Sequence, residues 1–320
     1  MDTDSLVIET HGLTKSYKGV EALKGLNLMV PRHSIFGFLG PNGAGKTTTM
    51  KLLLGLIRPT SGGGKVFGRD IVRDSIAIRS RIGYLPQQPR FVDGMTARET
   101  LRFTASFFFS GPEAGVEERI DETLALVGLS DKADRSVKGF SGGERQRLGI
   151  AQAQVHYPDL LILDEPAAAL DPMGRRDVLE VMERLRNHTT IFYSTHILDD
   201  VQRVSDAVAI LNRGELVAQG PIEELLAGGG EPVYILSLKG DATGALSRIR
   251  ALPWVSSVRE VARNGAVTWE IHVTDVQAAE AQLVREALAG DSLTLVEFGR
   301  KRFELEEVFV SIVEGENHGH

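Results

Sequence analysis

Short apolar runs of strand length alternate with helix-like segments along the first two thirds of the chain. The runs IFGFLG (35–40), LLILD (160–164) and TTIFYST (189–195) are apolar or β-branched almost throughout, which is typical of strands buried on both faces of a parallel sheet. The segment KTTTMKLLLGLI (46–57) reads as a helix that ends at Arg58-Pro59. The pattern therefore predicts an α/β core with helices covering the sheet.

Other segments of this region depart from that alternation. LVIETHGLTKSY (6–17) and EALKGLNLMV (21–30) are predicted as antiparallel strands, and AVAILNRGELVAQG (207–220) as a hairpin that turns at Asn212-Gly214. A turn is expected over residues 59–64, after which residues 71–85 return to the sheet. The first domain is thus expected to combine a mixed sheet with an antiparallel β subdomain.

Residues 95–135 have helical periodicity instead. They predict a helical subdomain, over about residues 89–155, inserted into the core. We expect its clustered phenylalanines, Phe103 and Phe107–Phe109, to form the interior of that subdomain. The alternative is that part of the cluster lines a groove for a helix of a membrane protein.

The run Ala227-Gly228-Gly229-Gly230 is the clearest domain boundary, so we expect one domain over 1–227 and a second over 231–320. The second domain reads β-α-β-β-α-β, with its two middle strands turning at Asn264-Gly265. This order predicts a small α+β, ferredoxin-like domain with a dimer-stabilising or regulatory role. A last helix is expected with one apolar stripe, formed by Leu305, Val308, Phe309, Ile312 and Val313.

Composition narrows the class of protein. The chain has 320 residues, of which 42% are hydrophobic and 25% charged, as in ordinary globular proteins. Its net charge of −7 makes nucleic acid an unexpected partner. It has no cysteine, which excludes disulfides and thiolate chemistry. No apolar run approaches the ~18 residues needed to span a bilayer, and the start lacks a secretion signal, so any membrane role is expected to need a separate membrane partner.

One phosphate-binding turn is complete. GPNGAGKT fits the pattern G-x-x-x-x-G-K-[ST] between a predicted strand and a predicted helix. Its glycines let backbone N–H groups turn toward phosphate oxygens, and the helix start adds a positive dipole end. Lys46 is expected on the β- and γ-phosphates, and the Thr47 hydroxyl on Mg²⁺. The expected nucleotide-binding residues are Gly40, Pro41, Asn42, Gly43, Ala44, Gly45, Lys46, Thr47 and Thr48.

The segment LLILDEP supplies acidic groups at the end of a buried strand. Ligands bind at the carboxyl ends of strands in parallel sheets, so Asp164 is expected to hold Mg²⁺. Glu165 follows it and is placed to orient or deprotonate a water. Together the two segments predict binding and hydrolysis of a nucleoside triphosphate.

A second helix start suited to phosphate lies in FSGGERQR (140–147). Ser141 is a good N-cap, and the N–H groups of Gly142 and Gly143 are free to bind a γ-phosphate. The turn at Lys46 already occupies the switch point of the sheet, so both elements are not expected to serve one nucleotide within one chain. We therefore expect this helix start to reach the nucleotide of a second copy, in a head-to-tail dimer.

At these residues the sequence resembles the ATP-binding cassette (ABC) ATPases, over residues 6 to about 225. GPNGAGKTT resembles their Walker A motif, FSGGE their signature motif and LLILDEP their Walker B motif. The resemblance implies the P-loop ABC ATPase fold, with ATP and Mg²⁺ as cofactors. It implies Glu165, His196 and Lys46 as catalytic residues, with His196 of YSTHILDD as the switch histidine.

Further roles also follow only from the resemblance. Gln87 matches the glutamine that touches Mg²⁺ and senses the membrane subunit; Gln88 is the neighbouring candidate, and position favours Gln87. Tyr17 resembles the aromatic residue that stacks on adenine, and Asp171 of ALDP the D-loop aspartate. Glu144 stands where the signature usually has glutamine, and its carboxylate can still accept from a ribose hydroxyl. Thr47, Gln87 and Asp164 form the expected metal shell.

The resemblance narrows to the ATPase subunits of daunorubicin-resistance-like exporters. It implies a transport-coupled ATPase, peripheral on the cytoplasmic face of the cell membrane, that pairs with a second copy and with an integral-membrane permease. Ala167, Ala168 and Ala169 replace the usual Thr, Ser and Gly, which bears on coupling between sites. The alternative is a soluble ABC ATPase acting on nucleic acid or ribosomes. A P-loop kinase or switch GTPase leaves the signature helix unexplained.

Overall fold

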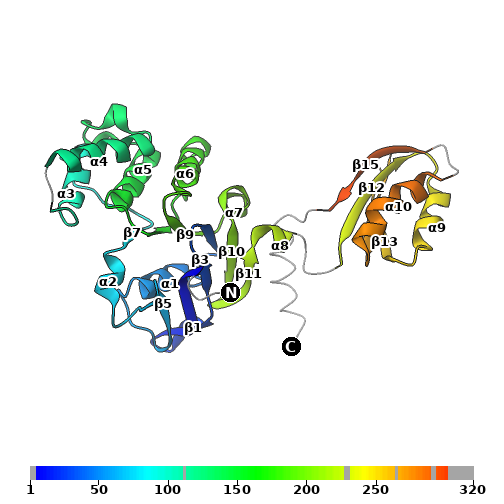
Figure 1. Ribbon diagram of the computed structural model, residues 1–320, viewed down its shortest axis with the longest axis horizontal. Helices are drawn as coiled ribbons and strands as arrows, with labels where there is room; N and C mark the ends of the chain where they lie inside the picture. Colours follow the sequence, from blue (N-terminus) through cyan, green and yellow to red (C-terminus); the bar gives the residue numbers. More distant parts are fainter. Residues whose placement is uncertain (1–4, 111–112, 227–230, 264–265, 290–292, 302–320) are drawn as a thin grey trace. The chain divides into compact units, whose positions relative to one another are not determined.

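The computed structural model describes residues 5–110, 113–226, 231–263, 266–289 and 293–301. The chain divides into two compact units between Ile222 and Glu223 (Figure 1). The glycine run expected as the boundary, residues 227–230, lies outside the described residues. Among the helices of the described part, none is long and apolar enough to cross a membrane.

A mixed sheet forms the centre of the first unit. Its strands from β10 to β7 are parallel, and β11 pairs antiparallel with β10 at one edge. The strands β4, β8 and β9 are buried at every position, as their uniform apolar character predicts. The order across the sheet is β11 (Glu215–Pro221), β10 (Ala207–Asn212), β4 (Ile35–Leu39), β9 (Thr190–Thr195), β8 (Leu160–Asp164) and β7 (Ile82–Leu85).

Helices pack against this sheet, which confirms the α/β prediction. They include α1 (Lys46–Leu53), α5 (Gly142–Gln154), α6 (Pro172–Leu185) and α7 (Leu198–Val204). Helix α1 ends four residues before the predicted end because Gly55 adopts a φ of +64°. A Cβ at Gly55 would lie 2.4 Å from the Cβ of Ser75, so only glycine fits this turn.

A second, antiparallel sheet contains β1 (Leu6–Tyr17), β2 (Val20–Leu26), β3 (Met29–Pro31), β5 (Ser61–Val66) and β6 (Arg69–Asp70). The turn predicted over residues 59–64 is wrong, because β5 already begins at Ser61. Close packing requires glycine at position 62, because a Cβ on Gly62 would lie 2.0 Å from the carbonyl oxygen of Gly12. The predicted return to the sheet over 71–85 holds only for β7, since α2 (Ser75–Arg79) precedes it.

The inserted region is helical, as expected. Helix α3 begins with a capping box in which Thr96 and Glu99 bond reciprocally. The region comprises α3 (Ala97–Ala105), α4 (Glu113–Leu126) and the 3₁₀ turns η2 (Ser130–Lys132) and η3 (Val137–Gly139), followed by α5. The phenylalanines expected in its interior lie largely outside it, because Leu101 and its neighbours fill the packed face of α3. The exposed fractions are 54% for Phe103, 71% for Phe107 and 42% for Phe108.

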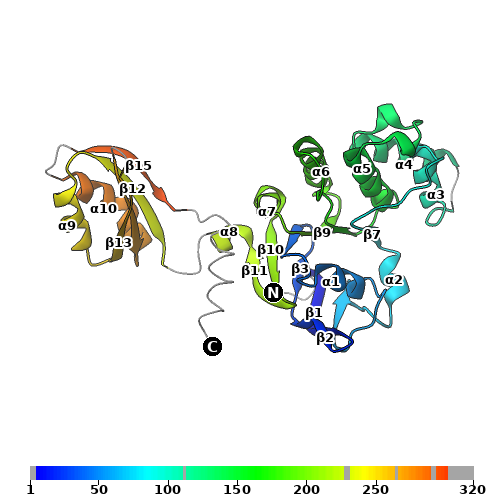
Figure 2. The same ribbon diagram turned by 180° about the vertical axis from the view of Figure 1, so that it is seen from behind.

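The second unit follows the predicted order β-α-β-β-α-β. Its sheet is antiparallel, in the order β13 (Val255–Arg263), β14 (Val267–Val273), β12 (Val233–Lys239) and β15 (Thr294–Arg300). Helices α9 (Thr243–Arg250) and α10 (Val276–Leu288) lie against one face of this sheet (Figures 1 and 2). Their apolar side chains are buried together with those of β12 and β14. Trp254 and Trp269 both lie in this core. The short helix α8 (Ile222–Leu226) begins where the two units divide.

The alternation predicted in β14 is present, with Trp269, Ile271 and Val273 buried on one face. Two other expectations for this unit fall outside the described residues. They are the turn at Asn264-Gly265 and the apolar stripe formed by Leu305, Val308, Phe309, Ile312 and Val313.

Candidate functional site

The glycine-rich turn between β4 and α1 is held in one conformation by its surroundings. Gly43 and Gly45 have φ of +82° and +110°, which side chains with a Cβ rarely adopt. A Cβ at Gly40 would lie 2.3 Å from the Leu211 carbonyl oxygen. The Ala44 carbonyl accepts from Gly214 N at 3.0 Å, so the β10–β11 hairpin braces the turn. The turn therefore already has the conformation that directs its backbone N–H groups toward a ligand at the start of α1.

Lys46 is the first residue of α1, and its side chain curls back over the turn. Its Nζ donates to the carbonyl oxygens of Gly40 at 2.6 Å and Pro41 at 3.2 Å. It also pairs with Glu165 Oε1 at 3.3 Å, and the two side chains are only 5% and 7% exposed. A buried ammonium is stable only with such partners. Here the anion that neutralises Lys46 is the predicted catalytic carboxylate.

Asp164 lies at the carboxyl end of β8, with both oxygens engaged. Its Oδ2 accepts from the Thr47 hydroxyl at 2.9 Å, and its Oδ1 accepts from Ser194 Oγ at 2.6 Å. The Ser194 oxygen also accepts from Glu165 N at 2.9 Å. Ser194 was not predicted. It pairs directly with Asp164 across β8 and β9. The sequence shows a hydroxyl one residue before the end of a buried segment, but it does not show that this segment lies beside the one that ends at Asp164.

Glu165 occupies a strained backbone position, with a φ of +50°. Such a conformation costs about 1–3 kcal/mol in a residue other than glycine and persists where the surroundings enforce it. Its Oε2 accepts from Gln87 Nε2 at 3.3 Å and lies 3.4 Å from His196 Nδ1. His196 is 41% exposed, so its ring has room to move. The predicted Gln87, Glu165 and His196 thus meet at one carboxylate.

Gln87 and Glu165 border a cavity of about 290 Å³, whereas His196 and Asp164 are not among the described residues that line it. It is lined by Asn42, Gly43, Gly45, Lys46, Thr47, Thr48, Gln87 and Glu165. Backbone donors and a buried ammonium on one side suit a polyphosphate. The Thr47 hydroxyl, the Gln87 amide and the Asp164 carboxylate supply the oxygen ligands that Mg²⁺ prefers. The residues therefore fit a magnesium–triphosphate complex, although each individual role stays a prediction.

Tyr17 lies at the end of β1 and is 44% exposed. Lys15 Nζ lies 4.9 Å from its ring centroid. The tyrosine is not among the described residues that line the cavity. Its role in stacking on adenine stays a prediction.

The signature helix α5 begins with a reciprocal capping box. Ser141 Oγ accepts from Glu144 N at 3.2 Å, and Glu144 Oε2 accepts from Ser141 N at 2.7 Å. The Ser141 hydroxyl therefore keeps its own proton for donation. The N–H groups of Gly142 and Gly143 belong to the first turn, where a helix offers them no internal partner. Three donors of the predicted phosphate grip are thus available.

Glu144 has a second partner that the sequence did not reveal. Its Oε1 lies 2.8 Å from Lys132 Nζ. Burial raises the pKa of Glu144, but the hydrogen bonds from Lys132 and from Ser141 N outweigh it and leave the pKa below its usual value. The Glu144 carboxylate is therefore ionised and already accepts hydrogen bonds from Lys132 and from Ser141 N. In the predicted contact, a ribose hydroxyl would bind the same carboxylate in addition to these two donors.

Helix α6 lies against the signature helix. Asp171 is its N-cap and accepts from Gly174 N at 2.8 Å. A Cβ on Gly143 would lie 3.3 Å from the Cα of Gly174, so glycines allow the two helix starts to approach closely. Within the described part of the chain, residues 141–144 do not line the cavity at Lys46.

Comparison with known proteins assigns the family. The family model described as "ABC transporter" matches residues 23–168. The chain is 39% identical to an ABC transporter ATP-binding protein, YxlF of Bacillus subtilis, over 96% of this chain and 99% of the relative. It is also 42% identical to the bacitracin transport ATP-binding protein BcrA of Bacillus licheniformis, over 69% of this chain and 72% of the relative.

Two further matches agree. The daunorubicin/doxorubicin resistance ATP-binding protein DrrA of Streptomyces peucetius is 40% identical, over 72% of this chain and 70% of the relative. Among solved structures, cbiO1 of Clostridium perfringens, part of an ABC transporter complex, superposes with a TM-score of 0.65 at 28% identity, covering 70% of this chain and 92% of that one. The resemblance predicted from the motifs is confirmed. The chain belongs to the ATP-binding proteins of ABC transporters and is an ABC-type ATP hydrolase.

Proposed function

We propose that this chain energises the export of a substrate through a separate membrane permease, by ATP-driven closure of a head-to-tail dimer. The observation that carries the proposal is the arrangement of its two phosphate-binding helix starts. One borders the cavity at Lys46, and the other, at Ser141, offers donors away from it. Support for export comes from relatives named for bacitracin transport and for daunorubicin resistance. The chain then works as a peripheral protein on the cytoplasmic face of the membrane.

Nucleotide binding would exchange the partner of Lys46. A triphosphate in the cavity competes with Glu165 for the Lys46 ammonium, since both are anions within reach of one buried cation. Thr47, Gln87 and Asp164 would hold Mg²⁺, which when bound neutralises charge on the β- and γ-phosphate oxygens. Glu165, released from Lys46, then accepts a proton from the attacking water.

His196 would act on the same region. Its Nδ1 lies 3.4 Å from Glu165 Oε2, so the ring reaches the space in which the γ-phosphate would sit. Donation from His196 would stabilise charge that develops on the phosphoryl oxygens.

Dimer closure would complete the site from the other copy. The Ser141 hydroxyl and the N–H groups of Gly142 and Gly143 would bind the γ-phosphate of the partner's nucleotide. ATP would then shift the equilibrium toward the closed dimer by contacts that exist only in that state. Hydrolysis removes the bridging phosphate and reopens the dimer.

The permease would contact the helical region. Phe103 and Phe107 are exposed and lie edge to face, with ring centroids 5.2 Å apart. Phe108 stacks on His156 at 3.8 Å while remaining 42% exposed. This exposed apolar surface suits a helix of the permease. That helix would then also sense the position of the loop that carries Gln87, which lies nearby in sequence.

The first experiment uses Glu165→Gln. This change keeps the shape of the site but removes the base, so Mg-ATP should convert the variant from monomer to dimer in gel filtration while turnover becomes very slow. Glu118→Gln is the matched control, because Glu118 is exposed on α4. It should hydrolyse ATP as the unchanged protein does. A monomeric Glu165→Gln variant with normal turnover would contradict the proposal.

The second experiment tests the shared site. Lys46→Ala damages the turn of one copy, and Ser141→Arg damages the signature of the other, so a mixed dimer retains one undamaged site. Mixing the two inactive variants should restore ATP hydrolysis that neither shows alone. No recovery in the mixture would refute the head-to-tail arrangement. Recovery of a permease from solubilised membranes, rather than ribosomes or nucleic acid, would separate transport from the alternative.

A further inference from the structure

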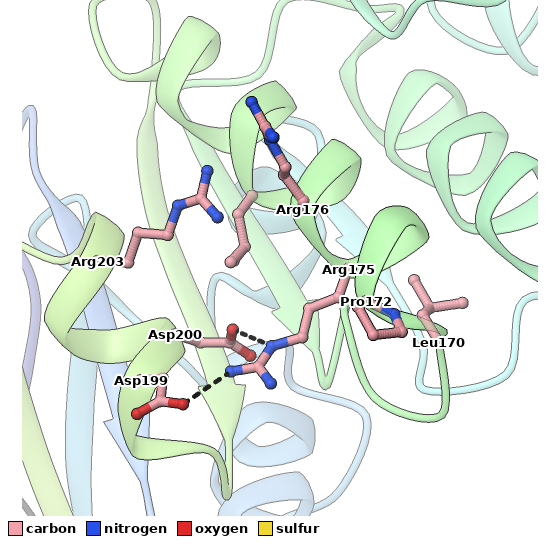
Figure 3. Close-up of a pocket in the computed structure, with 8 residues that line it drawn as sticks. Leu170, Pro172, Arg175, Arg176, Asp199, Asp200 and Arg203 are labelled. Carbon is pink, nitrogen blue, oxygen red and sulfur yellow. Dashed lines mark hydrogen bonds and ion pairs between the residues drawn. The ribbon is translucent and has the colours of Figure 1, made fainter.

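A groove separates the start of α6 from α7. It has a volume of about 320 Å³ (Figure 3). One side is lined by Leu170, Pro172, Arg175, Arg176 and Leu179, and the other by Asp199, Asp200 and Arg203. Figure 3 shows the Arg175 side chain extending from α6 across the floor of this groove toward Asp199 and Asp200. The groove is lined by three arginines and two aspartates, so charges of both signs face it. What it does contain is a direct link between two helices.

That link is the ion pair between Arg175 and Asp200. Arg175 Nε donates to Asp200 Oδ1 at 2.5 Å, and its Nη2 lies 3.9 Å from Asp199 Oδ2. Asp200 is only 1% exposed, whereas Arg175 is 28% exposed. A short charge-assisted bond to a buried acceptor fixes the distance between its two helices more firmly than a solvated surface pair does.

The two partners follow directly after functional segments. Arg175 lies one helical turn after Asp171, and Arg175 N donates to the Asp171 carbonyl at 2.9 Å. Asp200 lies four residues after His196, in the first turn of α7. The pair therefore connects the D-loop segment, which begins α6, to the segment that carries the switch histidine.

We propose that the Arg175–Asp200 ion pair is a positioning element, which holds His196 in register with the D-loop segment so that dimer closure places His196 against Glu165 and the γ-phosphate. The inference rests on the proposed dimer function, in which the D-loop segment of one copy meets the other copy. Movement of α6 at that interface is passed to α7 by the ion pair. His196, already 3.4 Å from Glu165, is thereby moved into or out of its working position.

A stabilising role does not account for the buried carboxylate. Burial raises the pKa of Asp200 above its usual value, although the hydrogen bond from Arg175 opposes this. Folding therefore favours the neutral carboxyl, and the stability that this group contributes is present at low pH and is lost as the pH rises through the raised pKa. The charged groups near it are Arg175, Asp199 and Arg203, and the Tyr193 hydroxyl is also close. The ionised form of Asp200, which the ion pair with Arg175 requires, is thus maintained at a cost to stability.

The test compares Asp200→Asn and Arg175→Gln with the matched control Arg176→Gln. Arg176 is the next residue of α6, lines the same groove and pairs with Glu180 of its own helix. We expect Asp200→Asn and Arg175→Gln each to lower kcat about 10- to 100-fold, because displacement of a catalytic group by about 1 Å has that effect. The KM for ATP should change by less than about twofold, since the cavity at Lys46 is untouched. Arg176→Gln should leave both values unchanged.

The unfolding temperature of Asp200→Asn and the kcat of the double variant distinguish a positioning role from a role in stabilising the fold. Asp200→Asn should unfold at the same temperature as the unchanged protein or at a higher one, while still losing kcat. The Asp200→Asn, Arg175→Gln double variant should lose no more kcat than either single variant, as expected when two residues act as one unit. An unchanged kcat in Asp200→Asn, or losses that multiply in the double variant, would overturn the inference.

Failure of this inference can be told apart from failure of the proposed function. Gel filtration of the Glu165→Gln variant with ATP reports dimer closure alone. If that dimer forms and Asp200→Asn still hydrolyses ATP normally, the positioning role is refuted and the transport proposal stands. If no dimer forms, the proposed function itself is refuted.

Discussion

Ser194 is the residue whose removal tests the site most directly. It is fully buried, and its single oxygen joins the two acidic residues, donating to Asp164 Oδ1 at 2.6 Å and accepting from Glu165 N at 2.9 Å. In Ser194→Ala both partners lose a hydrogen bond that water cannot easily replace. The expected result is a loss of both stability and hydrolysis.

The size of the effect follows from these two contacts. A hydrogen bond to a charged group contributes about 1.5–3 kcal/mol, and a buried N–H left without a partner costs about 1–3 kcal/mol. The two hydrogen bonds share one oxygen, so their losses are not independent. We expect Ser194→Ala to lower the free energy of unfolding by about 2–5 kcal/mol in total. Glu165 already holds an unfavourable φ of +50° that this bond helps to enforce. Its release should misplace the carboxylate and lower kcat at least about tenfold.

Ser34→Ala is the control for the loss of one buried serine hydroxyl. Ser34 is 6% exposed and donates to the Pro31 carbonyl oxygen at 2.9 Å, away from the acidic residues. Ser34→Ala should lower the free energy of unfolding by about 0.5–1.5 kcal/mol and leave kcat unchanged. Calorimetry suits the measurement because two units need not unfold in one transition. If Ser194→Ala matched Ser34→Ala in both stability and kcat, the reasoning from the Ser194 bridge would be wrong.

Three further predictions follow from other contacts. Lys46→Ala should weaken ATP binding about 10- to 100-fold, because it removes the buried cation. Lys51→Ala is the control, because Lys51 lies on the exposed face of the same helix and its removal should leave the affinity unchanged. Titration calorimetry measures both affinities. Glu144→Gln should lower the free energy of unfolding by about 1 kcal/mol at pH 7, because the ion pair with Lys132 and the charged helix cap are lost. That difference should be fully present above the ordinary pKa of 4.5 and vanish as the pH falls through the lowered folded pKa. The urea midpoints of the two proteins should therefore differ at pH 7 and converge in strong acid. Gly62→Ala should destabilise the first unit strongly, because a Cβ there would lie 2.0 Å from a carbonyl oxygen of β1, while Gly63→Ala meets nothing within 4 Å and should change the melting temperature little.

The sequence was sufficient for those parts of the site that one segment encodes. Lys46 and Thr47 follow a glycine turn whose backbone needs are visible in the letters themselves. Asp164 and Glu165 end a run of apolar residues, and the carboxyl end of a buried parallel strand is where ligands bind. The α/β fold followed from the same runs, because strands buried on both faces leave no polar alternation.

What the sequence could not show depends on contacts between distant segments. The pairing of Lys46 with Glu165 and the Ser194 bridge require the order of strands in the sheet, which no local pattern gives. The same holds for Gly62, which reads as a turn residue until the close approach of β1 is known. The exposed Phe103 and Phe107 were misjudged because apolar character alone does not distinguish a core from a binding surface.

Both tryptophans of the chain, Trp254 and Trp269, lie in the core of the second unit. Intrinsic emission excited at the red edge of the absorption band therefore reports on that unit alone and is silent about the ATPase core. Any change in this emission when ATP is added would be a signal transmitted from one unit to the other, without a label or an engineered probe. Tryptophan fluorescence can therefore show whether the second unit responds to nucleotide binding in the first.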